Sequence, residues 1–306
     1  MGAIYWTLPV LICTPSNFCE IASELLRKVV KVTKTISREN ITTQLQLSLT
    51  QLANNLADVA ASTIVPLFRT DKIITESKEK NRFDPVTQAD KAAELSIREI
   101  LAKQRPEDGI LGEEYGKVTS KSGLTWVLDP IDGTRAFISG SPTWGILIAL
   151  SDIEGPFLGV IDQPYIGERY IGGFGRAKFK GPQGERSLKT KRLDDLSETI
   201  LFTTFPAIGR EQDFCGFRAV HDRVKFVRYG MDCYAYALLA SGHIDLVIEA
   251  GLKAYDIQAP IALIEAAGGI VTNWRGESAQ GGGQAVAASN IKLLEQVLPY
   301  LKPFAD

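Results

Sequence analysis

The chain has 306 residues, of which 45% are hydrophobic and 23% charged, with 34 Lys and Arg against 36 Asp and Glu. This composition is typical of a globular protein of one or two domains and excludes a disordered or fibrous chain. The net charge of −2 excludes a chain-wide basic surface for nucleic acid. No stretch approaches the roughly 20 apolar residues that would cross a bilayer. We therefore expect neither a nucleic-acid nor a membrane partner. The 4 Cys and 2 His are scattered, which favours neither a disulfide scaffold nor a zinc site.

The start of the chain differs from the rest, and we divide the chain into an N-terminal extension over 1–46 and a main domain over 47–306. The first 19 residues carry no charge, so the basic start of a secretory signal peptide is absent. Lysines between 28 and 34, with nearby hydroxyl residues, suit an organelle-targeting segment, whereas the two glutamates before them do not. The two interpretations are a targeting extension and an extra helix docked on the domain.

The first half of the main domain, 47–190, has the pattern of helices followed by an antiparallel sheet. Apolar residues at helical spacing predict helices over 47–68 and 89–103, with a polar linker over 71–82 between them. Apolar runs broken by Gly and Pro predict hairpins over 156–180. The other predicted strands of this half are 110–112, 124–128 and 144–150.

The second half, 191–306, alternates strands with helices. The predicted strands are 199–204, 225–229, 246–249, 270–274 and 284–288. The predicted helices are 232–241, 256–267 and 290–301. Helices laid over sheets in two successive halves imply a layered α/β architecture.

The DPIDGT segment carries the clearest chemistry. An apolar strand ends at Asp129, Pro130 stops the strand, and Asp132 follows one short turn later, so that both carboxylates can face one point. Gly133 and Thr134 then offer backbone N–H groups at a predicted helix start, where an anion binds well. Hard oxygen ligands beside an anion site favour Mg²⁺ and a phosphate-bearing substrate. The alternative is a pair of helix-capping Asp residues in a tight turn.

Three further acidic motifs support the metal interpretation. Glu113 and Glu114 follow a short apolar run and supply another oxygen ligand. Asp90 and Asp256 each lie at the start of a predicted helix. Helix capping alone would explain either Asp90 or Asp256. It does not explain why four acidic motifs occur in this order along the chain.

The four motifs resemble those of the inositol monophosphatase family of Mg²⁺-dependent, lithium-sensitive phosphatases. The segments that carry the resemblance are 84–90, 112–114, 129–134 and 255–256 with 268–269, and it extends from about Leu47 to the C-terminus. It implies an αβαβα sandwich of the inositol monophosphatase and fructose-1,6-bisphosphatase type. It also implies a homodimer with two to three Mg²⁺ ions in each active site. The family's usual Trp before the last metal ligand is Tyr255 here.

Carried over residue by residue, the resemblance also implies the roles of the site residues. The implied metal ligands are Glu113, Asp129, the Ile131 carbonyl, Asp132 and Asp256. The implied catalytic residues are Glu113, Asp90 and Thr134, of which Asp90 and Thr134 orient the attacking water. The implied substrate-binding residues are Gly133 and Thr134, through their N–H groups, with Asp232, Glu249 and Asp256.

Three other segments, 133–140, 228–236 and 245–253, look like the histidinol-phosphate phosphatase branch of the family, and above all like its plant members. That branch implies hydrolysis of L-histidinol phosphate to L-histidinol and phosphate. Asp232 and Glu249 are then candidates to face the amino and imidazole nitrogens. The alternative for Glu249 is an ion pair with Arg228 or Lys253.

Two other functions remain open at this stage. One is the same chemistry on inositol phosphate or another small phosphate ester. The other is non-catalytic sensing of metal or phosphate, against which the intact ligand set argues. The pathway implied by the resemblance places a plant protein in the plastid stroma and any other in the cytoplasm, although the N-terminus is a poor transit peptide.

Overall fold

The computed structural model describes residues 36, 38–70, 75–79, 82–205 and 207–306. They belong to one compact unit that begins at Ile36, so most of the predicted extension lies outside the described residues. Its last part is packed in the unit, because Arg38 pairs with Asp152 at 2.7 Å and Ile41 is buried. The sequence had placed the boundary at Leu47. Within the described part of the chain, no helix has the length and apolar character needed to cross a membrane.

The larger sheet has eight strands in the order β10-β9-β8-β7-β6-β5-β3-β4. Its strands are β3 Gly109–Gly112, β4 Gly116–Val118, β5 Thr125–Asp132, β6 Gly145–Asp152, β7 Gly155–Gln163, β8 Glu168–Gly173, β9 Arg176–Gly181 and β10 Gly184–Ser187. Strands β3 and β5 pair in parallel, and the meander from β5 to β10 is antiparallel. The hairpins predicted over 156–180 are confirmed.

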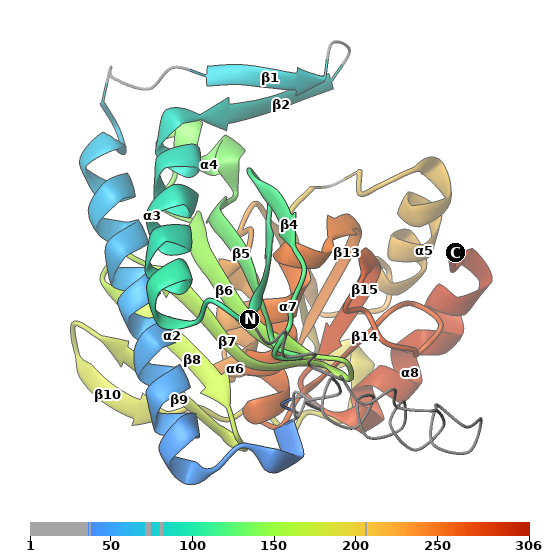
Figure 1. The fold of residues 1–306 in the computed structure, drawn as a ribbon. Coiled ribbons are helices and arrows are strands. Elements are labelled where there is room, and N and C mark those ends of the chain that lie inside the picture. The colour runs from blue at the N-terminus through green and yellow to red at the C-terminus, as the bar shows by residue number, and fades with distance from the viewer. Residues whose placement is uncertain (1–35, 37, 71–74, 80–81, 206) are drawn as a thin grey trace, which may run out of the picture. The chain divides into compact units, whose positions relative to one another are not determined.

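Helices cover both faces of this sheet (Figure 1). On one face lie α2 Thr43–Ile64 and α3 Gln88–Gln104, and on the other lie α6 Tyr234–Ala240 and α7 Ala254–Ala266. The alternation along β5 explains this division. Trp126 and Leu128 belong to the core under α2 and α3, whereas Val127 belongs to the core under α6 and α7. The sheet is therefore buried on both sides.

The smaller sheet completes the layers. Its order is β12-β11-β13-β15-β14, with β11 Ile200–Thr203, β12 Phe226–Tyr229, β13 Leu246–Lys253, β14 Ile270–Thr272 and β15 Gly282–Ala288. One face packs on the α6 and α7 layer, and the other packs on α5 Glu211–His221 and α8 Ile291–Leu301. The succession helix, sheet, helix, sheet, helix (Figure 1) confirms the predicted αβαβα sandwich. The shorter helices are α4 Thr134–Ser139 and the 3₁₀ turns η1 Arg38–Asn40, η2 Val65–Leu67, η3 Leu196–Glu198 and η4 Lys302–Phe304.

Helix α7 lies directly on the backbone of the larger sheet. A Cβ atom at Gly159 in β7 would lie 2.4 Å from the carbonyl oxygen of Ala259, and one at Gly172 in β8 would lie 2.4 Å from Cα of Leu263. The two strands therefore accept the helix only because these positions have no side chain. The closeness of this contact fixes the position of α7 relative to the sheet.

Two local predictions are wrong, and one helix was missed. The linker predicted over 71–82 contains strand β1 Thr75–Glu79, which pairs with β2 Arg82–Thr87, because backbone pairing needs no apolar pattern in the strand. Helix α5 was not predicted, since Phe217 and Val220 are the apolar residues that it buries and they form only a weak helical pattern. Strand β5 does not stop at Pro130 but continues to Asp132.

Candidate active site

Strand β5 presents two of the predicted ligands, Asp129 and Asp132, toward one point. Side chains three residues apart in a regular strand point to opposite faces. The pairing with β6 is irregular here, however, because Asp129 pairs with Leu147 and Asp132 with Gly145. One extra residue is thus accommodated in β5, as in a β-bulge, and Pro130, which has no N–H to donate, lies within it. The bulge lets both carboxylates face the same side.

Helix α7 supplies the third carboxylate of this cluster. Asp256 is the third residue of the helix and accepts a hydrogen bond from the Lys253 N–H at 2.7 Å. One oxygen each from Asp129, Asp132 and Asp256 lies within 4.8 Å of the other two. The capping role that the sequence offered as an alternative for Asp256 is therefore real, and it coexists with membership of the cluster. We call these three residues the aspartate cluster.

The aspartate cluster is electrostatically strained. Burial, and then repulsion by Glu113 and Asp132, raise the pKa of Asp129 well above its ordinary value. Burial and repulsion by Asp256 do the same to the pKa of Asp132. Burial raises the pKa of Asp256 to about 7, although the Lys253 N–H opposes the shift. A bound cation would relieve this repulsion.

One oxygen of the cluster provides a test of whether a metal fits. Asp129 is 2% exposed, and its Oδ1 atom is buried without a hydrogen-bond partner among the described residues. A buried carboxylate oxygen is costly unless something compensates its charge. Because the donors are all hard carboxylate oxygens, they suit Mg²⁺ better than softer metals. The residues present therefore fit a divalent ion.

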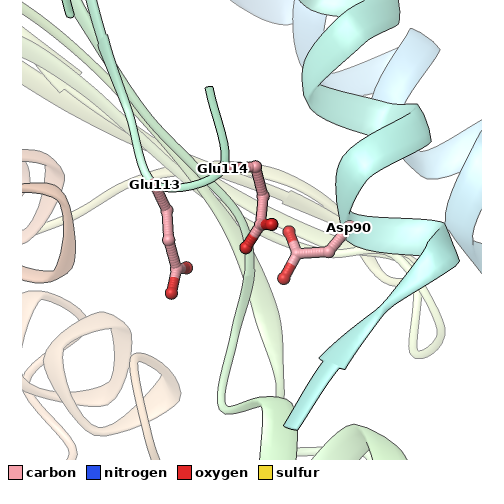
Figure 2. A group of neighbouring side chains, drawn as sticks. All are labelled: Asp90, Glu113 and Glu114. Atoms are coloured by element: carbon pink, nitrogen blue, oxygen red, sulfur yellow. The ribbon is translucent and has the colours of Figure 1, made fainter. Parts of the chain in front are cut away.

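A second acidic group, Asp90 with Glu113 and Glu114, lies at the ends of neighbouring elements. The parallel pairing of β3 with β5 continues beyond β3, since the Glu113 N–H donates to the Leu128 carbonyl at 3.2 Å. Glu113 therefore lies beside the C-terminal half of β5, which carries Asp129. One oxygen each from Asp90, Glu113 and Glu114 lies within 4.8 Å of the other two. Figure 2 shows the carboxylates of Asp90 and Glu114 pointing toward each other, with Glu113 next to them. The ligand set implied by the family resemblance includes Glu113 and leaves Glu114 out.

A cavity of about 950 Å³ opens beside the two acidic groups. Of the predicted site residues, its lining includes Glu113, Asp132, Gly133, Thr134, Asp232, Glu249 and Asp256. Gly133 makes the tight turn into α4 with φ at 84°, a left-handed conformation that favours glycine. The Thr134 hydroxyl donates to the Ile131 carbonyl at 3.2 Å, the carbonyl that the resemblance implies as a metal ligand. The relay from Asp90 to Thr134 stays a prediction.

The two residues predicted to select the substrate both face this cavity and are held by threonines. Asp232 Oδ2 accepts a hydrogen bond from the Thr143 hydroxyl at 3.0 Å, and burial raises its pKa. Glu249 is 6% exposed and accepts from the Thr204 N–H at 2.6 Å and from its hydroxyl at 2.8 Å. Burial raises the pKa of Glu249 to about 7. Among the described residues, no ion pair joins Glu249 to Arg228 or Lys253, which was the alternative.

Several cavity residues were not predicted. Arg135 lies over the ring of Phe205 at 4.9 Å, and both line the cavity. Tyr236 also lines it, and the Tyr236 hydroxyl is buried without a hydrogen-bond partner among the described residues. Arg135 and Tyr236 lie inside segments that carried the family resemblance. Tyr236 reaches the cavity through the packing of α6, and Phe205 reaches it through the loop after β11, and no local pattern predicts either arrangement.

The αβαβα sandwich, with two acidic groups that could hold metal ions beside a cavity, places the chain in a class of layered α/β proteins. The chain belongs to the inositol monophosphatase family, since the model of that family matches residues 45–303. Enzymes of the family use divalent metals, generally Mg²⁺, in agreement with the acidic groups described above.

Individual relatives agree with this placement. The bifunctional phosphatase IMPL2, chloroplastic, of Arabidopsis thaliana is 44% identical over 229 residues, a match that covers 74% of this chain and 64% of that protein. The histidinol-phosphatase of Mycobacterium tuberculosis is 36% identical, over 71% of this chain and 84% of that protein. Among solved structures, an inositol monophosphatase from Zymomonas mobilis superposes with a TM-score of 0.73 at 38% identity. That superposition covers 83% of this chain and 98% of the other.

Proposed function

We propose that the protein is a Mg²⁺-dependent phosphatase that hydrolyses a small phosphate monoester. The observation that carries the proposal is the aspartate cluster beside a large cavity, in which three like charges lie together and Asp129 Oδ1 has no hydrogen-bond partner among the described residues. A cluster of this kind costs folding stability unless a cation occupies it. Non-catalytic sensing of metal or phosphate is less well supported, because every ligand and water-orienting residue implied by the resemblance is present.

The residues have separate roles in this proposal. The metal ligands would be Glu113, Asp129, the Ile131 carbonyl, Asp132 and Asp256. Bound Mg²⁺ would neutralise charge on the phosphate and make a water molecule more acidic. Asp90 and Thr134 would orient the attacking water in line with the ester bond. The N–H groups of Gly133 and Thr134 would hold phosphate oxygens as the leaving group departs.

We further propose L-histidinol phosphate as the preferred substrate. This molecule carries a primary ammonium and an imidazole beside its phosphate ester. Asp232 is half-buried and Glu249 is buried on the cavity wall, and both carboxylates have raised pKa values. A substrate cation would stabilise their ionised forms, whereas the hydroxyl groups of inositol offer no positive charge. Relatives from three bacteria that carry the name histidinol-phosphatase support this choice.

The second candidate is hydrolysis of inositol phosphates or a broader range of small phosphate esters. It is favoured by the word bifunctional in the name of the Arabidopsis relative and by the inositol-1-monophosphatase of Caulobacter vibrioides, which is 32% identical over 73% of this chain. The same metal site would serve both kinds of substrate. The two candidates differ only in what Asp232 and Glu249 contact.

Release of free phosphate from a panel of substrates tests both candidates. The panel consists of histidinol phosphate, inositol 1-phosphate and an aryl phosphate, each with and without Mg²⁺. We expect Asp232→Asn to lower kcat/KM for histidinol phosphate by roughly 10–100-fold, because a charge-assisted hydrogen bond is worth roughly 1.5–3 kcal/mol. The aryl phosphate should be much less affected. Equal losses on both substrates would place Asp232 in the catalytic machinery or the fold and contradict its role in selection.

Two properties of the whole protein belong to the same proposal. We propose a plastid stromal location if the source is a plant, supported by the word chloroplastic in the name of the Arabidopsis relative. Import of a fluorescent fusion that carries residues 1–46 tests this. We also propose a homodimer, as in the family resemblance, which light scattering coupled to gel filtration tests.

A further inference from the structure

Helix α3 carries three charged residues at intervals of one turn, and only the first belongs to the site described above. Asp90, Glu94 and Arg98 are spaced by four residues and therefore lie on one side of the helix. Glu94 is 0% exposed, which is exceptional for a glutamate. A fully buried carboxylate requires several hydrogen bonds to offset its desolvation. The partners of Glu94 therefore indicate what it is for.

Among the described residues, the hydrogen-bond partners of Glu94 belong either to its own helix or to the turn that carries Glu113 and Glu114. Glu94 Oε2 accepts a hydrogen bond from the Glu114 N–H at 2.7 Å. Glu94 Oε1 accepts from the Tyr115 N–H at 3.1 Å and from Arg98 Nε at 2.7 Å. Arg98 in turn donates to the carbonyl of Gly116, where β4 begins. The Glu94–Arg98 pair thus binds the backbone of this turn at three consecutive residues.

The fit between Glu94 and the turn is tight on the strand side as well. A Cβ atom on Gly112, the last residue of β3, would lie 2.0 Å from Glu94 Oε1. The Glu94 carboxylate therefore occupies the space that a side chain at 112 would need. Strand β3, the turn and α3 are joined through this one carboxylate.

The turn needs such an anchor, because its side chains repel one another. Glu113 and Glu114 each bring a carboxylate oxygen within 4.8 Å of Asp90. Repulsion among three acidic side chains opposes the close approach of this turn to α3. Glu94 holds the turn through the backbone N–H groups of Glu114 and Tyr115. In this position of the turn, Glu113 lines the cavity and the Glu114 carboxylate points toward Asp90 (Figure 2).

We propose that Glu94 is a positioning residue that fixes the Glu113–Glu114 turn for metal binding, with Arg98 as its partner. Glu94 would act through the turn and contact neither metal nor substrate. The inference rests on the proposed function, because it assumes that Glu113 is a metal ligand. Partners of this kind, one shell behind a ligand, typically contribute 10–100-fold to metal affinity.

The variant Glu94→Gln tests the proposal with the full chain. Glutamine keeps the size of the side chain and one acceptor oxygen, but it places an NH₂ group against the N–H donors of the turn and loses the charge that pairs with Arg98. We expect Mn²⁺, used as the metal probe, to bind at least 10-fold more weakly in calorimetric titration. The Mg²⁺ concentration for half-maximal phosphate release should rise by a similar factor. At saturating Mg²⁺, the KM for substrate should stay within about 3-fold.

Asp108→Asn is a matched control. Asp108 is 5% exposed, pairs with Arg105 at 2.7 Å and accepts from the Trp126 indole N–H at 3.0 Å. It precedes β3 and so lies at the end of the strand opposite to the Glu113 turn. The substitution removes the ion pair between Asp108 and Arg105, which resembles the pair between Glu94 and Arg98. We expect this variant to lower the melting temperature and to leave the Mn²⁺ affinity unchanged.

The outcomes separate this inference from the proposed function. A wild-type protein that binds Mn²⁺ and releases phosphate, with a Glu94→Gln variant that binds Mn²⁺ equally well, would overturn the inference alone. A wild-type protein that binds no Mn²⁺ would overturn both. If Glu94→Gln does not fold, Arg98→Lys serves instead, since lysine keeps the charge but has only one nitrogen to share between Glu94 and the Gly116 carbonyl. A folded Arg98→Lys with unchanged Mn²⁺ affinity would then overturn the inference.

Discussion

Replacing Asp256 by Asn should stabilise the metal-free protein at pH 8, because Asp256 is a helix cap that lies among like charges. Its pKa is raised to about 7 from 3.8, so ionisation costs the folded state roughly 4 kcal/mol at about 1.36 kcal/mol per unit. Asparagine retains an oxygen for the Lys253 N–H and so keeps the cap. Since 1 kcal/mol corresponds to roughly 2 °C in a chain of this size, we expect the Tm to rise by roughly 4–8 °C.

The effect has a defined dependence on pH. A carboxyl group whose pKa is higher in the folded state destabilises that state as the pH rises through the unfolded value, and the penalty is complete above the folded value. For Asp256 this window runs from 3.8 to about 7. The difference in Tm between variant and wild type should therefore be largest at pH 8. It should shrink by more than half at pH 5 and vanish near pH 3.

Asp213 offers a matched control for the calorimetry. Asp213 is also the third residue of a helix, α5, and accepts the Arg210 N–H at 2.7 Å. Burial raises its pKa, but the Arg210 side chain and N–H outweigh burial and lower it. Asp213→Asn should therefore lower the Tm of the metal-free protein, measured at pH 8 in a buffer that contains EDTA. The reasoning is refuted if metal-free Asp256→Asn melts at or below wild type while Asp213→Asn is destabilised. Added Mg²⁺ should raise the Tm of wild type more than that of Asp256→Asn.

Three further predictions concern the site. Exhaustive chelation should abolish phosphate release, and restored Mg²⁺ should recover it; full turnover after chelation would contradict the metal site. Thr134→Ala should lower kcat by roughly 10²–10⁴-fold with little change in KM in steady-state kinetics, whereas an unchanged kcat would remove Thr134 from catalysis. Tyr236→Phe should not lower the Tm in thermal denaturation, because the buried hydroxyl that it removes has no partner among the described residues. Tyr234→Phe should lower it, because the Tyr234 hydroxyl donates to Glu168 at 2.9 Å, and a loss in Tyr236→Phe alone would contradict this reasoning.

The layered fold could be predicted from the sequence because its large elements have strong local patterns. Helices α2 and α7 each bury many apolar residues, and the strands of the larger sheet are apolar runs bounded by Gly and Pro. Elements that depend on their neighbours were missed. The sequence of strand β1 is entirely polar, and the strand is recognised only by its backbone pairing with β2. Helix α5 buries few apolar residues, and its start is marked by the capping interaction between Arg210 and Asp213.

The site was predictable to the extent that its chemistry lies in short motifs. Asp129 and Asp132 are close in sequence, and their meeting with Asp256 followed from the family resemblance. The residues that hold them in place lie far from them in sequence and carry no motif of their own. Thr204 holds Glu249 only because β11 and β13 are neighbouring strands. Contacts of this kind follow from tertiary packing, which no local pattern encodes.

Helix α7 begins with the turn that carries Asp256 and then rests on bare backbone at Gly159 and Gly172. A methyl group at either glycine would lift the helix from the sheet, and its first turn would move with it. The distance between Asp256 and Asp129 would then change although neither residue had been altered. In a screen of all single substitutions, changes at either glycine should therefore abolish activity as substitutions of the aspartate cluster do, although the variant proteins remain folded. A map of inactivating substitutions would extend across the middle of the sheet, well beyond the residues that surround the cavity.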